Sequence, residues 1–113
     1  RRRKRIGERA AGGFYDHNWV LRGERGTLRS VALLTEPTSG RAMEVLTKEP
    51  GIQFYTGKFI ATQTGKGGVP YAAQSGLCLE TQTFPDSPNK PHFPSSQLRP
   101  GQVYESETIY RFH

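Results

Sequence analysis

The chain has 113 residues, of which 34% are hydrophobic, a low share for a domain that encloses its own core. Its net charge is +6, but five of the sixteen Lys and Arg residues are the first five of the chain, which leaves the remainder nearly balanced. A terminal basic run is typical of a solvated chain end, which argues against a nucleic-acid partner, and no apolar run is long enough to span a membrane.

The low apolar content predicts that part of the core comes from elsewhere, from a missing segment or from another subunit. Cys78 is the single cysteine, which excludes an intramolecular disulfide and favours a reducing compartment, the cytoplasm. The three histidines stand far apart, without Cys or carboxylate partners at the spacing of a zinc site. We therefore expect no metal.

The predicted elements are short strands separated by Gly and Pro. The first distinctive stretch, "FYDHNW" at 14–19, has two readings. It is either a polar turn, which the pattern alone favours, or a carboxylate beside aromatic rings, as in many sugar sites. A hairpin is expected next, with strands at 27–36 and 41–48 and the turn "PTSG" at 37–40 between them.

The second half of the chain continues in the same way. A short strand is expected at 52–55, and "GKGG" at 65–68 is expected to be a flexible loop without the setting of a phosphate loop. The next strand is 77–84, and the five prolines of 85–100 predict an ordered, extended loop. Residues 102–112 alternate like a strand. Because no segment sustains a period of 3.6, the fold class is all-β, a sandwich or barrel.

Glu80 is a carboxylate inside an otherwise apolar strand. Side chains alternate along a strand, so Glu80 shares its face with Cys78 and Gln82, and Gln53 shares a face with Tyr55. The pattern leaves two readings open. Glu80 and Gln53 line a polar pocket on a sheet face, or Glu80 is exposed on an edge strand.

Together these segments resemble the aldose 1-epimerase (galactose mutarotase) family. The resemblance runs over almost the whole chain, through "GGFYDHNWVL", "PTSGRAMEVLTKEPGIQFYTGKF", "SGLCLETQTFPDSPNKP" and "LRPGQVYESETIYRF" in the expected order. It implies an all-β fold, an antiparallel β-sandwich of the galactose mutarotase-like type that is incomplete in this chain. Residues 1–113 would be the C-terminal part of a single domain, with 1–10 as a basic lead-in segment.

The resemblance also implies a function. The chain would belong to an isomerase that interconverts the α and β anomers of free hexoses, such as glucose or galactose, by acid/base ring opening and closure. Glu80 would be the general base, and Asp16 and Gln53 would contact the sugar, with no cofactor and no metal. The family's general-acid His lies upstream of the matched region, so we expect little or no activity from this chain alone. Lys58 stands where the family has Asn.

Two alternatives stay open at this point. The chain is a mutarotase-like module that binds carbohydrate without turnover, because the acid is absent. Or Asp16 and Glu80 are the carboxylate pair of a glycosidase, which requires a separation of about 5–5.5 Å or about 6.5–9.5 Å. The expected partners are a small-molecule aldose and either a missing N-terminal half or an oligomer that covers the exposed sheet, with no nucleic acid and no membrane.

Overall fold

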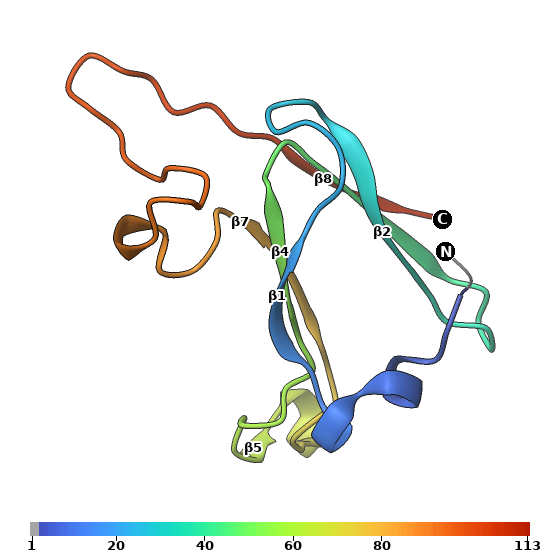
Figure 1. Ribbon diagram of the computed structural model, residues 1–113. Helices are drawn as coiled ribbons and strands as arrows, with labels where there is room; N and C mark the ends of the chain where they lie inside the picture. The colour runs from blue at the N-terminus through green and yellow to red at the C-terminus, as the bar shows by residue number, and fades with distance from the viewer. Residues whose placement is uncertain (1–2) are drawn as a thin grey trace. The chain divides into compact units, whose positions relative to one another are not determined.

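The structure is a computed structural model that describes residues 3–113, so the first two residues of the basic lead-in lie outside the described residues. Its regular elements are short strands and 3₁₀ turns (Figure 1). Within the described part, no helix is long and apolar enough to cross a membrane. The strands are β1 (Asp16–Val20), β2 (Arg29–Thr35), β3 (Ala42–Thr47), β4 (Gly51–Tyr55), β5 (Gln63–Thr64), β6 (Pro70–Tyr71), β7 (Cys78–Gln82) and β8 (Thr108–Phe112). The 3₁₀ turns are η1 (Ile6–Arg9), η2 (Ala11–Gly13), η3 (Lys66–Gly68) and η4 (Ser87–Asn89).

The strands form three sheets, and the predicted all-β class is confirmed. Their orders are β1-β4-β7, β2-β3-β8 and β5-β6. The chain divides into two compact units, which are described separately. Unit 1 comprises Arg1–His17 and Gln53–Glu80, and unit 2 comprises Asn18–Ile52 and Thr81–His113. Unit 1 contains the β5-β6 hairpin and unit 2 contains the β2-β3-β8 sheet, while β1, β4 and β7 each have residues in both units.

The predicted hairpin of unit 2 is confirmed as β2 and β3, which pair antiparallel. Its turn is closed by Glu36, whose carbonyl accepts from Gly40 N–H at 2.9 Å. The Glu36 carboxylate accepts from Thr38 N–H at 2.8 Å and from Ser39 N–H at 2.7 Å. Gly40 has φ +73°, a left-handed conformation that costs glycine little. Local sequence therefore specifies this turn.

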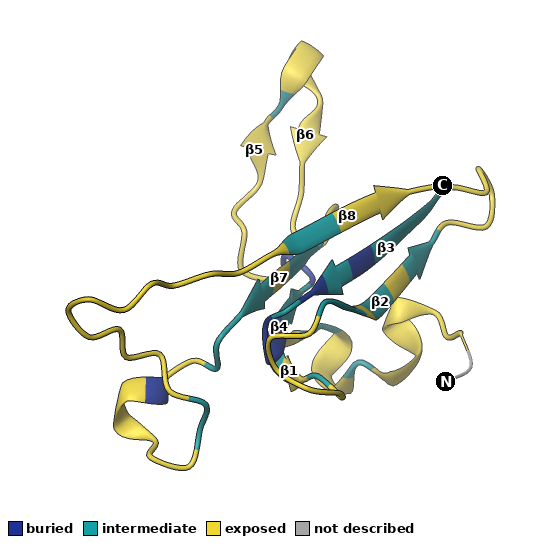
Figure 2. Cartoon of the chain, turned by 90° about the horizontal axis from the view of Figure 1, so that it is seen from above, coloured by how far each residue is buried: buried dark blue, intermediate teal, exposed yellow. Residues whose placement is uncertain are grey.

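The core of unit 2 is formed around buried residues of β3, the central strand of the β2-β3-β8 sheet. β3 pairs antiparallel with β8, and Val45 stands opposite Tyr110. Val45 and Thr47 are fully buried at 0% exposure, as the dark-blue segments of β3 in Figure 2 illustrate. Among the described residues, the buried apolar side chains are Val45, Ile52 and Pro50. A core this small is in line with the low apolar content of the sequence.

Hydroxyl groups join three strands of unit 2. Thr108 Oγ1 lies 3.0 Å from Thr47 Oγ1 and 2.7 Å from Thr81 Oγ1. Thr47 Oγ1 also accepts from Glu49 N–H at 3.1 Å. β3, β8 and β7 are thereby linked through side chains.

Two expectations from the sequence are wrong, the turn within 14–19 and the extent of the last strand. The polar turn expected within 14–19 is instead β1, because the flanking backbone of Tyr15 and Leu21 bonds to residues beside β4. The "GKGG" segment is the expected loop, between β5 and β6, and it contains η3; Gly65 N–H donates to Val69 O at 2.7 Å across it. The strand expected at 102–112 begins only at Thr108.

Candidate functional site

Asp16 and Gln53 are brought together in unit 1. Gln53 Nε2 donates a hydrogen bond to Asp16 Oδ1 at 2.7 Å. Asp16 is exposed and Gln53 is half-buried, so the pair lies at the surface of the unit. A carboxylate held by an amide presents the acceptors and donors that sugar hydroxyls require.

Backbone bonds and ring contacts hold β1 against β4 beside this pair. Tyr15 N–H donates to Thr56 Oγ1 at 2.9 Å, and Thr56 N–H donates to Tyr15 O at 2.9 Å. The Tyr15 ring stacks on Phe54 with ring centroids 4.9 Å apart. Such ring pairs add about 0.5–1.5 kcal/mol beyond the area that they bury. Thr56 is buried, at 7% exposure, so these bonds are shielded from water.

An aromatic cluster adjoins the pair in the same unit. Tyr55 stands two residues after Gln53, and alternation places the two side chains on one face of β4. The Tyr55 hydroxyl accepts from Phe59 N–H at 2.8 Å, and the two rings stack with centroids 6.5 Å apart. Phe14 meets Phe59 edge to face at 5.3 Å. The residues Phe14, Tyr55 and Phe59 are called the aromatic cluster below.

Glu80 also lies in unit 1, on β7, with its side chain exposed. β7 is at the end of the order β1-β4-β7, so an exposed position on an edge strand describes its surroundings in this chain. Burial raises the pKa of the Cys78 thiol, and the charge and hydrogen bonding of Glu80 raise it further. The two side chains therefore lie together on one face of β7.

A polar contact that we did not expect from the sequence lies in unit 2. Gln82 Nε2 donates to Asn18 Oδ1 at 3.1 Å, and both residues are half-buried. A Cβ at Gly51 would lie 2.7 Å from Asn18 Oδ1. The only signal in the sequence was position, because each residue stands two places from a predicted site residue on the same strand.

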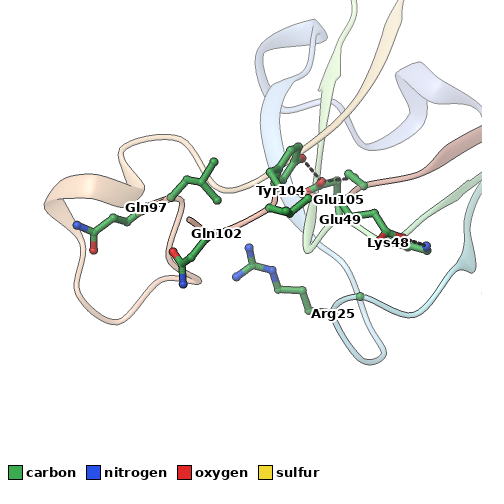
Figure 3. Close-up of a pocket in the computed structure, with 11 residues that line it drawn as sticks. Arg25, Lys48, Glu49, Gln97, Gln102, Tyr104 and Glu105 are labelled. Atoms are coloured by element: carbon green, nitrogen blue, oxygen red, sulfur yellow. Dashed lines mark hydrogen bonds and ion pairs between the residues drawn. The ribbon is translucent and has the colours of Figure 1, made fainter. Parts of the chain in front are cut away.

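Each unit also has a hollow, and neither is lined by Asp16, Gln53 or Glu80. The hollow of unit 1 has a volume of about 350 Å³ and that of unit 2 about 290 Å³. The first is lined by Ile6, Gly7, Ala10, Gly13, Phe14, Tyr15, Thr56 and residues 74–77. The second is lined by Arg25, Gly26, Lys48, Glu49, Gln97, Leu98 and residues 102–106 (Figure 3).

Internal contacts engage several polar groups of the unit 2 hollow (Figure 3). Glu49, only 6% exposed, accepts from Tyr104 Oη at 2.6 Å and from Ser106 Oγ. The hydrogen bond to Glu49 raises the pKa of Tyr104. Lys48 Nζ forms an ion pair with Glu105 at 3.3 Å, and hydrogen bonding to its acidic neighbours raises the pKa of Lys48. The arrangement fastens the chain after Pro100 to the end of β3.

Comparison with known proteins decides the family. The family model described as aldose 1-epimerase matches residues 1–111. The chain belongs to the aldose 1-epimerase family. It is 48% identical over 99 residues to galactose mutarotase of Mus musculus, a match that covers 87% of this chain and 29% of that protein. It is 37% identical over 100 residues to aldose 1-epimerase of Escherichia coli K12, with the same two coverages.

A solved relative confirms the fold. A crystal structure of a GalM/aldose epimerase homologue from C. elegans superposes with a TM-score of 0.80 at 31% identity, over 89% of this chain and 30% of that one. The antiparallel β fold of the galactose mutarotase-like type, expected from the sequence, is confirmed. The chain spans about 29% of the length of the curated relatives it matches, as expected for the C-terminal portion that the resemblance indicates.

Proposed function

We propose that the chain forms part of the sugar site of an aldose 1-epimerase, an isomerase that acts on free hexoses. Glu80 is the general base, and Asp16 and Gln53 bind sugar hydroxyls. Family membership supports the reaction class. The observation that carries the site is the 2.7 Å bond from Gln53 Nε2 to Asp16 Oδ1, within the same unit as Glu80.

The proposed reaction needs one base and one acid. The Glu80 carboxylate takes the proton from the C1 hydroxyl while an acid protonates the ring oxygen, and the C1–O5 bond breaks to give the open aldehyde. Rotation about C1–C2 exposes the other face of the aldehyde, and the ring closes with both protons returned. Each positioned proton transfer contributes about 10²–10⁴-fold, and neither a metal nor a cofactor takes part.

The substrate class follows from the names of the relatives, galactose mutarotase and aldose 1-epimerase. We take D-galactose and D-glucose as the aldoses to test. The acid would be the family's His, upstream of the region matched by the resemblance. A cytoplasmic location stays a prediction from the single cysteine.

A missing N-terminal half, or an oligomer, would cover the exposed part of the unit 2 sheet. Tyr110 stands opposite Val45, and Phe112 stands opposite Met43. Because paired residues of an antiparallel sheet share a face, all four side chains lie on one face of the sheet. Tyr110 is 44% exposed and Phe112 is 75% exposed, whereas Val45 is fully buried. We propose that residues 1–113 are the C-terminal part of a single domain, with 1–10 as its basic lead-in.

A non-catalytic carbohydrate-binding module is the second candidate. The exposure of Glu80 favours this candidate. Water weakens the electrostatic interactions of an exposed carboxylate, so such a group is a less effective catalyst than one in a closed, dry site. In this alternative Asp16 and Gln53 still bind sugar, but Glu80 transfers no proton.

Polarimetry and calorimetry together test the proposal. The chain is added to freshly dissolved α-D-galactose or α-D-glucose, and the optical rotation is followed against buffer alone. We expect heat of binding from the sugar and little acceleration of mutarotation, because the acid is absent. In a longer chain that supplies the acid, Glu80→Gln should abolish the acceleration, and Glu24→Gln, a matched exposed carboxylate in unit 2, should leave it unchanged.

Each outcome separates the candidates. Clear activity of this chain, lost in Glu80→Gln, would contradict our account of the acid. Activity that survives Glu80→Gln would contradict the role of the base. Sugar binding that is lost in Asp16→Asn, without turnover in any form of the protein, would favour the binding module.

A further inference from the structure

Phe59 is a large apolar side chain that is 69% exposed although two other rings hold it in place. Its ring stacks on Tyr55 at 6.5 Å and meets the edge of Phe14 at 5.3 Å. Its backbone N–H donates to the Tyr55 hydroxyl at 2.8 Å. An exposed ring that is fixed by several contacts loses little conformational freedom when a ligand stacks on it.

The aromatic cluster stands next to the groups that would bind hydroxyls. Gln53, which donates to Asp16 Oδ1, and Tyr55 are two residues apart and share one face of β4. Phe14 stands two residues before Asp16, in extended backbone. One side of unit 1 thus combines an exposed aromatic ring with a carboxylate and an amide.

This combination suits one face of a pyranose ring. Aromatic rings pack against C–H groups, while carboxylates and amides bond to hydroxyls. In D-galactose the axial hydroxyl at C4 leaves the C–H groups at C3, C4 and C5 together on the opposite face. In D-glucose the C4 hydroxyl is equatorial, and this apolar patch is smaller.

We propose that Phe59 is a stacking platform for the apolar face of the aldose, and that it favours galactose over glucose. The proposal rests on the sugar site proposed above and adds a specificity-determining residue to it. Tyr55 is a positioning residue, because its hydroxyl and ring hold the segment that carries Phe59. Phe59 itself touches the sugar.

The test measures sugar binding by the 113-residue chain, with ¹⁵N-labelled protein titrated with D-galactose and with D-glucose. Phe59→Ala should raise the Kd for galactose about fivefold to tenfold, in line with the strength of an aromatic contact, and the Kd for glucose less. Phe59→Trp should restore galactose binding to within about twofold. Phe112→Ala removes a similarly exposed ring, 75% against 69% for Phe59, from unit 2 and should change neither Kd.

A second measurement needs no variant. Saturation of the aromatic protons of the wild-type chain should transfer most strongly to H3, H4 and H5 of bound galactose. If Phe59→Ala loses its fold, this measurement and Phe59→Leu, which keeps an apolar side chain without a ring, still decide the matter. Phe59→Leu should weaken galactose binding by about the same factor as Phe59→Ala.

The possible failures are distinct. If the wild-type chain binds no aldose, the proposed sugar site fails, and the platform fails with it. If the chain binds galactose in an Asp16-dependent way but Phe59→Ala leaves the Kd unchanged, the platform alone is overturned. Binding without transfer to H3, H4 and H5 would show that no aromatic ring of the chain contacts this face of the sugar, which also overturns the platform.

Discussion

The Asn18 side chain lies directly against the backbone of Gly51, so closely that a Cβ at position 51 would be 2.7 Å from Asn18 Oδ1. The same Cβ would be 2.9 Å from a ring carbon of Phe84. Gly51 lies in β4 and its φ is outside the left-handed region, so space rather than backbone conformation requires glycine here. The missing side chain makes room for the hydrogen bond between Asn18 and Gln82.

Gly51→Ala should therefore destabilise the chain by about 1–3 kcal/mol, the usual cost of overpacking a well-packed site. The measurement is urea denaturation followed by tryptophan fluorescence. Gly76→Ala is the matched control, because no atom lies within 4 Å of its Cβ position and its φ is not positive. Equal stability of Gly51→Ala and the wild type would show that Asn18 moves aside without cost.

The turn at Glu36 should make the stability of the chain depend on pH. Hydrogen bonds from the Ser39 side chain, and then from the backbone of Thr38 and Ser39, lower the pKa of Glu36 from 4.5 to about 2. Because the folded pKa is depressed, the stabilisation is fully present above pH 4.5 and is lost as the pH falls towards 2. Glu36→Gln should be less stable than the wild type at pH 7.

The difference in urea midpoint between wild type and Glu36→Gln should shrink between pH 4.5 and pH 2, the interval set by the two pKa values. Glu24→Gln serves as the control and should follow the wild type throughout. A difference that stays constant down to pH 2 would contradict this account of the turn.

The pH dependence of Cys78 alkylation should show the influence of the neighbouring Glu80 carboxylate. Burial and then the Glu80 carboxylate raise the pKa of the thiol above 9.0, so less reactive thiolate is present at a given pH. The pH profile for alkylation by iodoacetamide should therefore be shifted to higher pH than that of a free thiol. Glu80→Gln should move the profile part of the way back, because burial, the larger cause, remains. A profile identical in Glu80→Gln and wild type would mean that the two side chains are not neighbours.

Tyr104→Phe should destabilise the chain by about 1.5–3 kcal/mol, the range for hydrogen bonds to charged groups. The lost hydroxyl donates to the buried Glu49 carboxylate at 2.6 Å, which would keep only Ser106 of its two hydroxyl donors. Tyr71→Phe, at a 48% exposed position in unit 1, is the control. Equal unfolding temperatures for both variants would show that water replaces the Tyr104 hydroxyl without cost.

Local signals in the sequence were enough to predict the β2-β3 hairpin. Its strands are adjacent in the chain, and the turn between them is fixed by Glu36 and Gly40. β1 could not be found in this way, because its pairing partner β4 lies more than thirty residues away. The polar run from Asp16 to Asn18 suggests a turn until that partner is known.

The candidate site also combines features that the local sequence predicts with features that depend on pairing between distant strands. Alternation alone predicted that Gln53 and Tyr55 share a face, whereas the contact of Gln53 with Asp16 depends on pairing between distant strands. The roles assigned to Asp16, Gln53 and Glu80 came from the family resemblance and stay predictions. Phe59 stood in the quoted "QFYTGKF" stretch, but its support by Tyr55 becomes visible only in three dimensions.

The three threonine hydroxyls of unit 2 give the last residues of the chain an unexpected importance. Thr108 is the middle member, in contact with Thr47 in β3 and Thr81 in β7. A protein shortened after Glu107 would lose β8 and also the anchor of the strand in which Glu80 immediately precedes Thr81. A stop codon that replaces the Thr108 codon would then disturb a strand encoded almost thirty codons earlier.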